Sequence, residues 1–425
     1  MTISTKIARK SGVLKRRVRI LINLIDEGSY EKAHAQFGSE LKQQVSPAQL
    51  EQVWNGVEDQ NGEFQSISKL KVRTQKGTDI VTGQITLEHG RAEIITAFRD
   101  KTIIGFQVHQ LGPKWSGPSY VNESTFTEQN ITIQATDTCS LDGTVTVPYN
   151  TTQAPGIVLV HGQGPSDRDG TVGPNKPYKD LAWGLASRGI AVLRYDKRTQ
   201  VCNPNLAEIT INEAVTDDAL AAIETLRKSP NVADNSIFVV GHSIGATLAP
   251  RIATRDGNLA GTGMLAPLAR SAADAIDDQT QYLATRDGVV TEAEEQQLKL
   301  VDQITKQIRS LNFPDDKVVY LGGDEYWSSL QRYEALETAK CLPIPQLLLQ
   351  GERDYQVTIE DDFRHWHAIL GGKSNVSFEQ YPKLNHLFMP GTGKSGPEEY
   401  RKQNHVAEQV VLDIASFVKK IVSAD

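Results

Sequence analysis

The decapeptide Ile237-Phe-Val-Val-Gly-His-Ser-Ile-Gly-Ala246 joins a run of four apolar residues to a Gly-x-Ser-x-Gly pattern. The apolar run is typical of a buried strand, and a helix is expected from Ala246 onward. A strand that turns this tightly into a helix needs glycine on both sides of the serine, because a larger side chain would collide with neighbouring backbone. The pattern predicts that Ser243 lies exposed on a strained turn, as a nucleophile does. The alternative is an ordinary Gly-Ser turn.

Short apolar strands alternate with helices on both sides of this turn. The strands are expected at 130–135, 143–147, 156–160, 190–195, 236–240, 261–265, 345–349 and 376–380, with a turn at 141–143. The clearest amphipathic helices are 212–228 and 404–421. This alternation predicts an α/β fold with a mostly parallel sheet and helices on both faces. Residues 269–340 read as helix without a strand, and we expect a helical cap there, with a capping box at Thr291–Glu294.

The first hundred residues have a different pattern. A helical stripe covers 13–26, and the capping box Ser46-Pro-Ala-Gln49 opens a helix that reaches about Glu58. Strands are expected at 66–72, 79–87, 92–99 and 102–108. We therefore predict a small α+β accessory domain at 1–110, a linker at 111–128, and a catalytic domain at 129–425 that includes the cap. The accessory domain is expected to cover the site, mediate dimerisation or aid folding, and the sequence does not choose among these.

A nucleophilic serine needs a base, and the base needs an acid to orient it. In α/β-hydrolases these follow the serine in the order acid, then histidine, each after a later strand. Asp354 follows the strand 345–349, and His386 follows the strand 376–380. The rival carboxylates are Glu352 in the same loop and the pair Asp361 and Asp362, which is expected in the first turn of the next helix.

Acyl transfer also needs N–H donors for the oxyanion. The backbone N–H of Ile244, directly after the serine, is one candidate. The second is expected in the loop His161-Gly-Gln-Gly164, which follows the first buried strand, and the backbone N–H of Gln163 is the favoured donor. The alternative is that this loop is merely flexible.

Several longer motifs resemble a subgroup of bacterial and archaeal α/β-hydrolase carboxylesterases. They are His161-Gly-Gln-Gly-Pro-Ser-Asp-Arg-Asp169, Gly173-Pro-Asn-Lys-Pro-Tyr-Lys-Asp180, Leu193-Arg-Tyr-Asp-Lys-Arg198, Gly241-His-Ser-Ile-Gly245, Gly351-Glu-Arg-Asp-Tyr-Gln356 and Leu384-Asn-His-Leu-Phe388. In that subgroup a small N-terminal domain of unknown function often precedes the catalytic one. The resemblance implies an α/β-hydrolase fold and a serine esterase acting on short acyl esters, with Ser243, Asp354 and His386 at the matching triad positions. Gln163, where a small residue is commoner, and Cys202-Asn-Pro204 depart from the pattern and leave the pocket shape open.

Other residues allow two interpretations. Tyr326 and Trp327 in the cap are candidates for the wall of an acyl pocket or for ordinary packing of the cap. The loop and strand ends near the predicted site are rich in charge: Asp167, Arg168, Asp169, Lys176, Asp196, Lys197 and Arg198. These groups either brace the loop with ion pairs, which we favour, or recognise a polar substrate.

Composition excludes several classes of protein. The chain has 425 residues, 39% of them hydrophobic, and a net charge of −7, which favours neither nucleic acid nor an acidic membrane as partner. We expect a cytoplasmic enzyme that acts on a small-molecule ester, without a membrane-spanning segment, and a homodimer is one open arrangement. The three cysteines lie far apart, with no zinc-ligand spacing, so we expect reduced thiols. The proposed chemistry requires no metal and no organic cofactor, and we expect neither. Amide or peptide cleavage, acyl transfer to another acceptor, and a non-enzymatic ligand-binding role are the alternatives.

Overall fold

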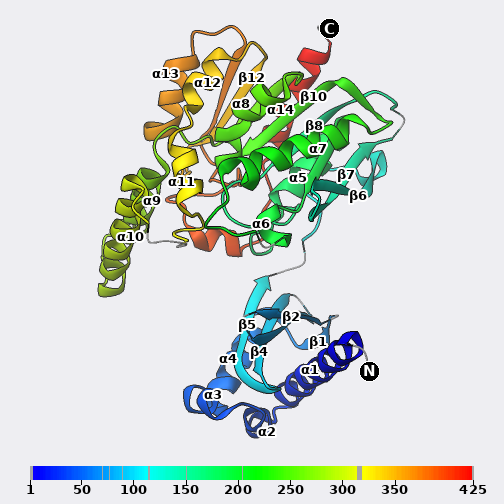
Figure 1. The fold of residues 1–425 in the computed structure, drawn as a ribbon, viewed down its shortest axis with the longest axis vertical. Helices are drawn as coiled ribbons and strands as arrows, with labels where there is room; N and C mark the ends of the chain where they lie inside the picture. Colours follow the sequence, from blue (N-terminus) through cyan, green and yellow to red (C-terminus); the bar gives the residue numbers. More distant parts are fainter. Residues whose placement is uncertain are drawn as a thin grey trace. The chain divides into compact units, whose positions relative to one another are not determined.

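The computed structural model describes residues 3–68, 70–75, 77–88, 90–112, 115–149, 151–202, 204–313 and 318–423. The chain forms two compact units, Met1–Ser116 with Tyr400–Gln403, and Gly117–Glu399 with Asn404–Asp425. Figure 1 shows the elements of both units. Residues 113–114 of the expected linker and 314–317 of the expected cap lie outside the described residues.

The smaller unit packs helices against an antiparallel sheet, as an α+β domain does. Its helices are α1 (Ile3–Asp26), α2 (Tyr30–Ala35), α3 (Ser39–Gln44) and α4 (Pro47–Asn61). Its strands are β1 (Phe64–Ile67), β2 (Lys71–Gln75), β3 (Thr78–Leu87), β4 (Arg91–Arg99) and β5 (Thr102–Gly112). They pair in the order β1-β3-β4-β5, and β2 also pairs with β3. The predicted class of this domain is confirmed.

Helical periodicity and capping explain the two longer helices of this unit. Leu14, Val18 and Leu21 of α1 are fully buried and recur at helical spacing, so that one face of α1 joins the core of the unit. At the start of α4 the backbone N–H of Gln49 donates to the Ser46 hydroxyl, and the backbone N–H of Ser46 donates to the Gln49 side chain. The predicted capping box is confirmed.

The single strand predicted at 66–72 is wrong, because two short strands occupy this stretch. β1 pairs with the Leu87 end of β3, and β2 pairs with its Thr78 end. Between them Leu70 turns into the core, where a side chain at Gly83 would collide with it. The buried Leu70 thus lies between two strands, where the residue pattern alone predicts one continuous strand.

The larger unit is built on a mostly parallel sheet of eight strands. They are β6 (Phe126–Thr136), β7 (Cys139–Pro148), β8 (Ala154–Val160), β9 (Ala191–Tyr195), β10 (Val232–His242), β11 (Gly261–Leu265), β12 (Gln346–Gly351) and β13 (Val376–Tyr381). Their order is β13-β12-β11-β10-β8-β9-β7-β6. All neighbours from β13 to β9 are parallel, and only β7 and β6 join antiparallel at one edge. The predicted α/β sheet is confirmed.

Helices cover both faces of this sheet (Figure 1). They are α5 (Pro177–Ala186), α6 (Arg198–Val201), α7 (Asp217–Arg227), α8 (Ile244–Asp256), α13 (Arg364–Leu370) and α14 (Glu408–Val422), with short helical turns at Glu123–Thr125, Asn212–Thr216, Ile359–Phe363 and Pro397–Arg401. Helix α5 contacts α14, whereas α7 contacts α8. None of the helices in the described part of the chain is long and apolar enough to cross a membrane.

The stretch between β11 and β12 is helical. It contains α9 (Ala272–Thr285), α10 (Glu292–Ser310), α11 (Asp324–Gln331) and α12 (Ala335–Cys341). The predicted capping box at Thr291 and Glu294 opens α10. Helices α9 and α10 lie side by side, and Arg309 joins them through an ion pair with Asp274 at 2.7 Å (Figure 1).

The turn expected at 141–143 is wrong, because the chain turns at Asp137–Thr138 and 141–143 lie inside β7. Gly143 serves a different purpose there. A Cβ atom at this position would lie 3.0 Å from the carbonyl oxygen of Arg194 on β9. Close approach of the neighbouring strand therefore favours glycine at this position, although glycine in a sequence also suggests a turn.

The expectation of reduced thiols is also wrong for two of the three cysteines. Cys139, at the start of β7, and Cys202, directly after α6, form a disulfide. Their separation of 63 residues matches no spacing motif, so only the fold reveals that they are neighbours. Cys341 is free and exposed.

Candidate active site

Ser243 occupies the turn between β10 and α8. Its backbone has φ 55° and ψ −125°, a strained conformation for a residue with a side chain. A Cβ at Gly241 would lie 2.2 Å from the carbonyl oxygen of Gly245, and one at Gly245 would lie 2.4 Å from the carbonyl oxygen of His161. Both contacts are impossible, so the two glycines are required by the turn that presents the Ser243 side chain.

Asp354 and His386 meet at the carboxyl ends of β12 and β13. The Nδ1 atom of His386 lies 2.6 Å from Oδ2 of Asp354, and both side chains are buried. The other carboxylate oxygen of Asp354 accepts the backbone N–H groups of Gln356 at 2.8 Å and Val357 at 3.0 Å. The carboxylate is therefore fixed, and it holds a proton on Nδ1 so that Nε2 is left as the basic nitrogen.

The loop that carries His386 is held by its neighbour Asn385. The side-chain oxygen of Asn385 accepts the backbone N–H groups of Leu387 at 3.1 Å and Met389 at 3.2 Å. Its side-chain N–H donates to Glu399 at 2.9 Å. These contacts restrict the position of the imidazole, because they bind the chain on both sides of it.

The two predicted oxyanion donors lie at the ends of β8 and β10. Ile244 is the first residue of α8, where backbone N–H groups have no partner within the helix. On the opposite loop, a Cβ at Gly162 would lie 3.2 Å from Cβ of Ser243, so the loop backbone passes close to the serine. Gln163 follows, and in the described part of the chain no acceptor takes its backbone N–H.

Two neighbours of these residues were missed by the sequence analysis. Tyr178 of α5 accepts the backbone N–H of Gly162 at 3.3 Å, and its hydroxyl lies 3.5 Å from Nδ1 of His242. The Nε2 atom of His242 lies 2.8 Å from the carbonyl oxygen of His386. Tyr178 and His242 thus connect the loop of Gly162 to the loop of His386. Tyr178 belongs to a quoted motif, but nothing in the sequence indicated this contact.

Ser243 borders two cavities. One, of about 280 Å³, is lined by Ser243, His386, Tyr178 and Thr171. The other, of about 230 Å³, is lined mainly by apolar side chains of the cap and the neighbouring loops: Leu268, Ala272, Ala275, Ile276, Tyr320, Leu321 and Val357. Gln163 and Gln356 line both cavities. Ser243 therefore lies between one compartment beside His386 and another beneath the cap.

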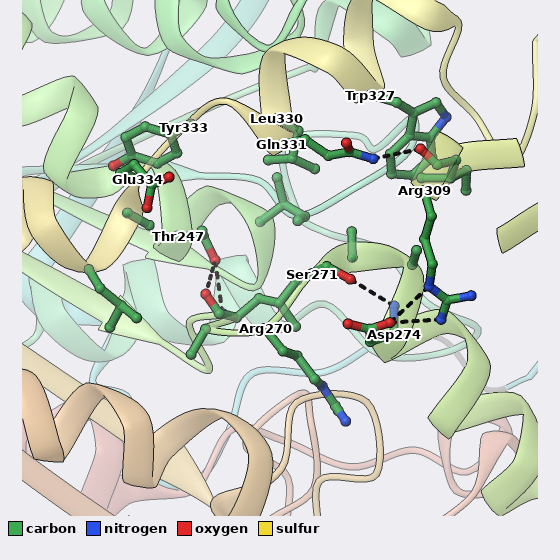
Figure 2. A pocket seen from close by; sticks show the side chains of 18 residues that line it. Thr247, Arg270, Ser271, Asp274, Arg309, Trp327, Leu330, Gln331, Tyr333 and Glu334 are labelled. Atoms are coloured by element: carbon green, nitrogen blue, oxygen red, sulfur yellow. Dashed lines mark hydrogen bonds and ion pairs between the residues drawn. The ribbon is translucent and has the colours of Figure 1, made fainter. Parts of the chain in front are cut away.

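A larger cavity of about 480 Å³ lies farther along the cap (Figure 2). It includes Ile244 but not Ser243 among its lining residues. Three of its charged lining residues are paired, since Arg309 binds Asp274 at 2.7 Å and Arg270 lies 3.2 Å from Asp361. Glu334 is the fourth charged side chain that lines it.

The two aromatic residues proposed for the pocket wall lie away from Ser243. Trp327 is fully buried, lines the larger cavity, and donates its indole N–H to the carbonyl oxygen of Val319 at 3.0 Å. Tyr326 is buried in the core, and it lines neither of the cavities that Ser243 borders within the described residues. Tyr320 and Leu321 occupy the place beside Ser243 instead.

The charged residues near the site mostly brace one another. Arg168 pairs with Asp196 at 2.8 Å, and Asp169 pairs with Arg194 and with Lys176. These contacts favour the bracing interpretation over recognition of a polar substrate. Among the residues that the structure describes, no group of three or more histidine, cysteine, aspartate or glutamate side chains is arranged to hold a metal ion.

The chain matches two sequence families. Residues 19–106 match a protein family of unknown function (DUF3887), and residues 157–390 match the family described as serine aminopeptidase, S33. The esterase EstD of Thermotoga maritima is 34% identical over 413 residues, which cover 96% of this chain and 96% of the esterase.

Solved structures with a similar chain path include an esterase of Pyrococcus furiosus, which is 17% identical; the match covers 72% of this chain and 96% of that chain, with a TM-score of 0.46. Another is the α/β hydrolase GrgF of Penicillium, which is 17% identical; the match covers 70% of this chain and 99% of that chain, with a TM-score of 0.48.

Proposed function

Because the chain belongs to the α/β-hydrolase esterases, we propose that it cleaves short-chain carboxylic esters through an acyl-enzyme on Ser243. In this proposal Asp354 and His386 complete the triad, and the backbone N–H groups of Gln163 and Ile244 bind the oxyanion. The contact of 2.6 Å between His386 and Asp354 supports the assignment most directly. It orients the imidazole of His386, which borders a cavity together with Ser243.

The reaction follows from these positions. Nε2 of His386 takes the proton of the Ser243 hydroxyl as its oxygen attacks the ester carbonyl. The tetrahedral intermediate places its negative oxygen on the two N–H donors. His386 then protonates the leaving alcohol, and the acyl group stays on Ser243. Water repeats the sequence on the acyl-enzyme and releases the carboxylic acid, so that serine and histidine return to their starting states.

The two cavities support an assignment of the two halves of the substrate. Since His386 delivers a proton to the alcohol, the alcohol belongs in the cavity that His386 lines. The acyl chain then enters the cavity of about 230 Å³ between Leu268, Ile276 and Leu321. Its apolar lining suits an alkyl chain, and its small volume favours a short one.

Substitution of the serine tests this proposal. We expect Ser243→Ala to lower kcat for p-nitrophenyl butyrate by at least about 10⁴-fold, because the acyl-enzyme no longer forms. Circular dichroism should show that the variant remains folded. In the unmodified protein, a fluorophosphonate should label Ser243, as peptide mass spectrometry would detect. Unchanged turnover in Ser243→Ala, or no adduct on this residue, would contradict the proposal.

Ester and amide cleavage require a separate comparison, because one triad serves both. A p-nitrophenyl ester and the p-nitroanilide of the same acyl group differ only in the leaving atom. The relation to the Thermotoga esterase favours the ester. A higher kcat/KM on the anilide would reverse this preference.

The predicted homodimer and cytoplasmic location stay predictions. The disulfide between Cys139 and Cys202 counts against the cytoplasm, because disulfides persist mainly in oxidising compartments.

A further inference from the structure

Lys197 is a buried lysine whose ammonium group binds a peptide carbonyl. It lies just after β9, its residue is 4% exposed, and its Nζ donates to the carbonyl oxygen of Gly162 at 2.6 Å. Within the described residues no carboxylate lies at ion-pair distance from this Nζ; Asp218, on α7, is bound by Arg198 instead. Burying a charge without a carboxylate partner is costly, so this contact needs an explanation beyond packing.

The contact fixes the direction of the peptide between Gly162 and Gln163. The described chain contains no cis peptide bond, so this peptide is trans, and its carbonyl and N–H point to opposite sides. With the carbonyl held by Lys197, the N–H of Gln163 points away from the lysine. The same loop passes next to Ser243, and Gln163 lines both cavities that the serine borders.

A positive charge on a peptide oxygen also strengthens the N–H donor. It draws electron density across the partial double bond of the peptide, and linked hydrogen bonds reinforce one another in a buried setting. The other side of Gly162 is fixed as well, because its N–H donates to the hydroxyl of Tyr178. Unlike the N–H of Gly162, the N–H of Gln163 has no acceptor among the described residues.

We propose that Lys197 is a positioning residue for ester hydrolysis, which orients and polarises the peptide between Gly162 and Gln163 so that the N–H of Gln163 stabilises the oxyanion. This inference rests on the proposed function of Ser243. Lys197 touches neither substrate nor reacting atoms and acts through the peptide alone.

The role of Lys197 has a signature in the pH profile. Burial lowers the pKa of Lys197 to about 8, and the charge of Asp218 partly opposes that shift. The titratable groups that face it are Asp218, which Arg198 binds, and His161 on the loop after β8. Burial lowers the pKa of His161 to about 3. His161 is therefore neutral across the assay range. As pH rises through 8 the ammonium loses its charge, the peptide loses its polarisation, and kcat falls.

Three variants test the inference. Lys197→Met removes the charge and the donor at similar length, Lys197→Gln keeps a donor without the charge, and Lys179→Met is the control. Lys179, on α5, is also a partly buried lysine, and its ammonium lies over the ring of Trp183. The thermal unfolding of all three variants is measured as well, to identify any variant that has lost its fold.

We expect Lys197→Met to lower kcat for p-nitrophenyl butyrate by about 10- to 100-fold with KM little changed, because the oxyanion forms only during reaction. The alkaline decline near pH 8 should vanish. A trifluoromethyl ketone, whose adduct with serine carries an oxyanion, should bind more weakly by a similar factor. Lys197→Gln should recover part of kcat and show no decline near pH 8, whereas Lys179→Met should match the unmodified enzyme.

Two results would overturn the inference while leaving the proposed function intact: a Lys197→Met enzyme with unmodified kcat, or a decline near pH 8 that persists without the lysine. If Lys197→Met does not fold, the same comparisons on Lys197→Gln decide. If Ser243→Ala turns over esters as fast as the unmodified enzyme, both the inference and the proposed function are overturned.

Discussion

At the scale of single residues, two buried histidines link the stability of the larger unit to pH. His161 and His242 flank the proposed oxyanion loop and nucleophile, and burial lowers the pKa of each to about 3. In the unfolded chain a histidine titrates near 6.5. Between these values the unfolded state binds more protons than the folded one. The contribution of the two histidines to the free energy of unfolding is therefore fully present above about pH 6.5 and is lost as pH falls toward 3.

Lowering the pH from 7 to 5 should therefore cost about 2 kcal/mol for each histidine, or about 4 kcal/mol together. Hydrogen exchange of the β10 amides, corrected for the intrinsic rate, measures this loss. His242→Gln should reduce the dependence by about half. Between pH 7 and 8 the two histidines contribute almost nothing, and this interval is the internal control. Equal protection at pH 5 and 7 would contradict the prediction.

Residues with a local signal can be predicted from the sequence, and residues placed by distant parts of the chain cannot. Ser243, Asp354 and His386 each follow a strand in a fixed order, which a linear pattern can express. The approach of Lys197 to Gly162 depends on how two parallel strands lie side by side. In the sequence Lys197 is only one of several charged residues near the predicted site. Its contact with the carbonyl oxygen of Gly162 is visible only in the fold.

At the scale of elements, a strained turn of the cap lies beside the proposed nucleophile. Val319 and Gly322 exchange backbone hydrogen bonds, and between them Tyr320 and Leu321 have φ of 45° and 72°. Turns of this kind strongly prefer asparagine and glycine, so their sequence signal is absent here. The side chain of Gln163 donates to the carbonyl oxygen of Tyr320 at 3.3 Å, which ties the turn to the oxyanion loop.

Leu321 should set the length of the acyl chain, because it lines the apolar cavity at Ser243. Leu321→Ala keeps the Cβ atom, so the backbone preference at this position is similar, but it opens space in the cavity. We expect the ratio of kcat/KM for p-nitrophenyl octanoate to kcat/KM for p-nitrophenyl butyrate to rise about tenfold. Leu300→Ala is the control, since Leu300 is about as exposed and lies on α10 outside that cavity. The hypothesis fails if both variants keep the original ratio.

Tyr326 and Trp327, for which the sequence allows either a pocket wall or packing of the cap, lie against this turn. Aromatic residues in a helical stretch suggest a pocket wall, yet these two pack beneath Gly322, where a Cβ would lie 2.6 Å from the ring of Tyr326. They support the turn from inside the core. Periodic elements such as α10 and β11 were predictable because their pattern is local, whereas the route of the cap over the serine depends on side chains far apart in sequence.

At the scale of the whole molecule, the division of the chain into two units is marked by a change of pattern from helices and a meander to alternating strands and helices. The linear pattern is sufficient to find that change. The linear pattern contains no signal for the disulfide between Cys139 and Cys202 in the larger unit. The disulfide ties strand β7, which lies between β9 and the edge strand β6, to the segment after β9 that also carries Lys197.

The disulfide should stabilise the larger unit by restricting its unfolded chain. Closing a loop of 63 residues is worth about 4 kcal/mol in the chain-entropy treatment, and observed values are commonly 2–4 kcal/mol. We expect Cys139→Ala with Cys202→Ala to lower the urea concentration that halves esterase activity, and dithiothreitol to do the same to the unmodified protein. Cys341→Ala, which removes the free thiol, should leave this urea concentration and the effect of dithiothreitol unchanged. If the double variant resists urea as well as the unmodified protein, the disulfide contributes no stability. If it resists urea normally but loses kcat, the disulfide acts instead on the segment that positions Lys197.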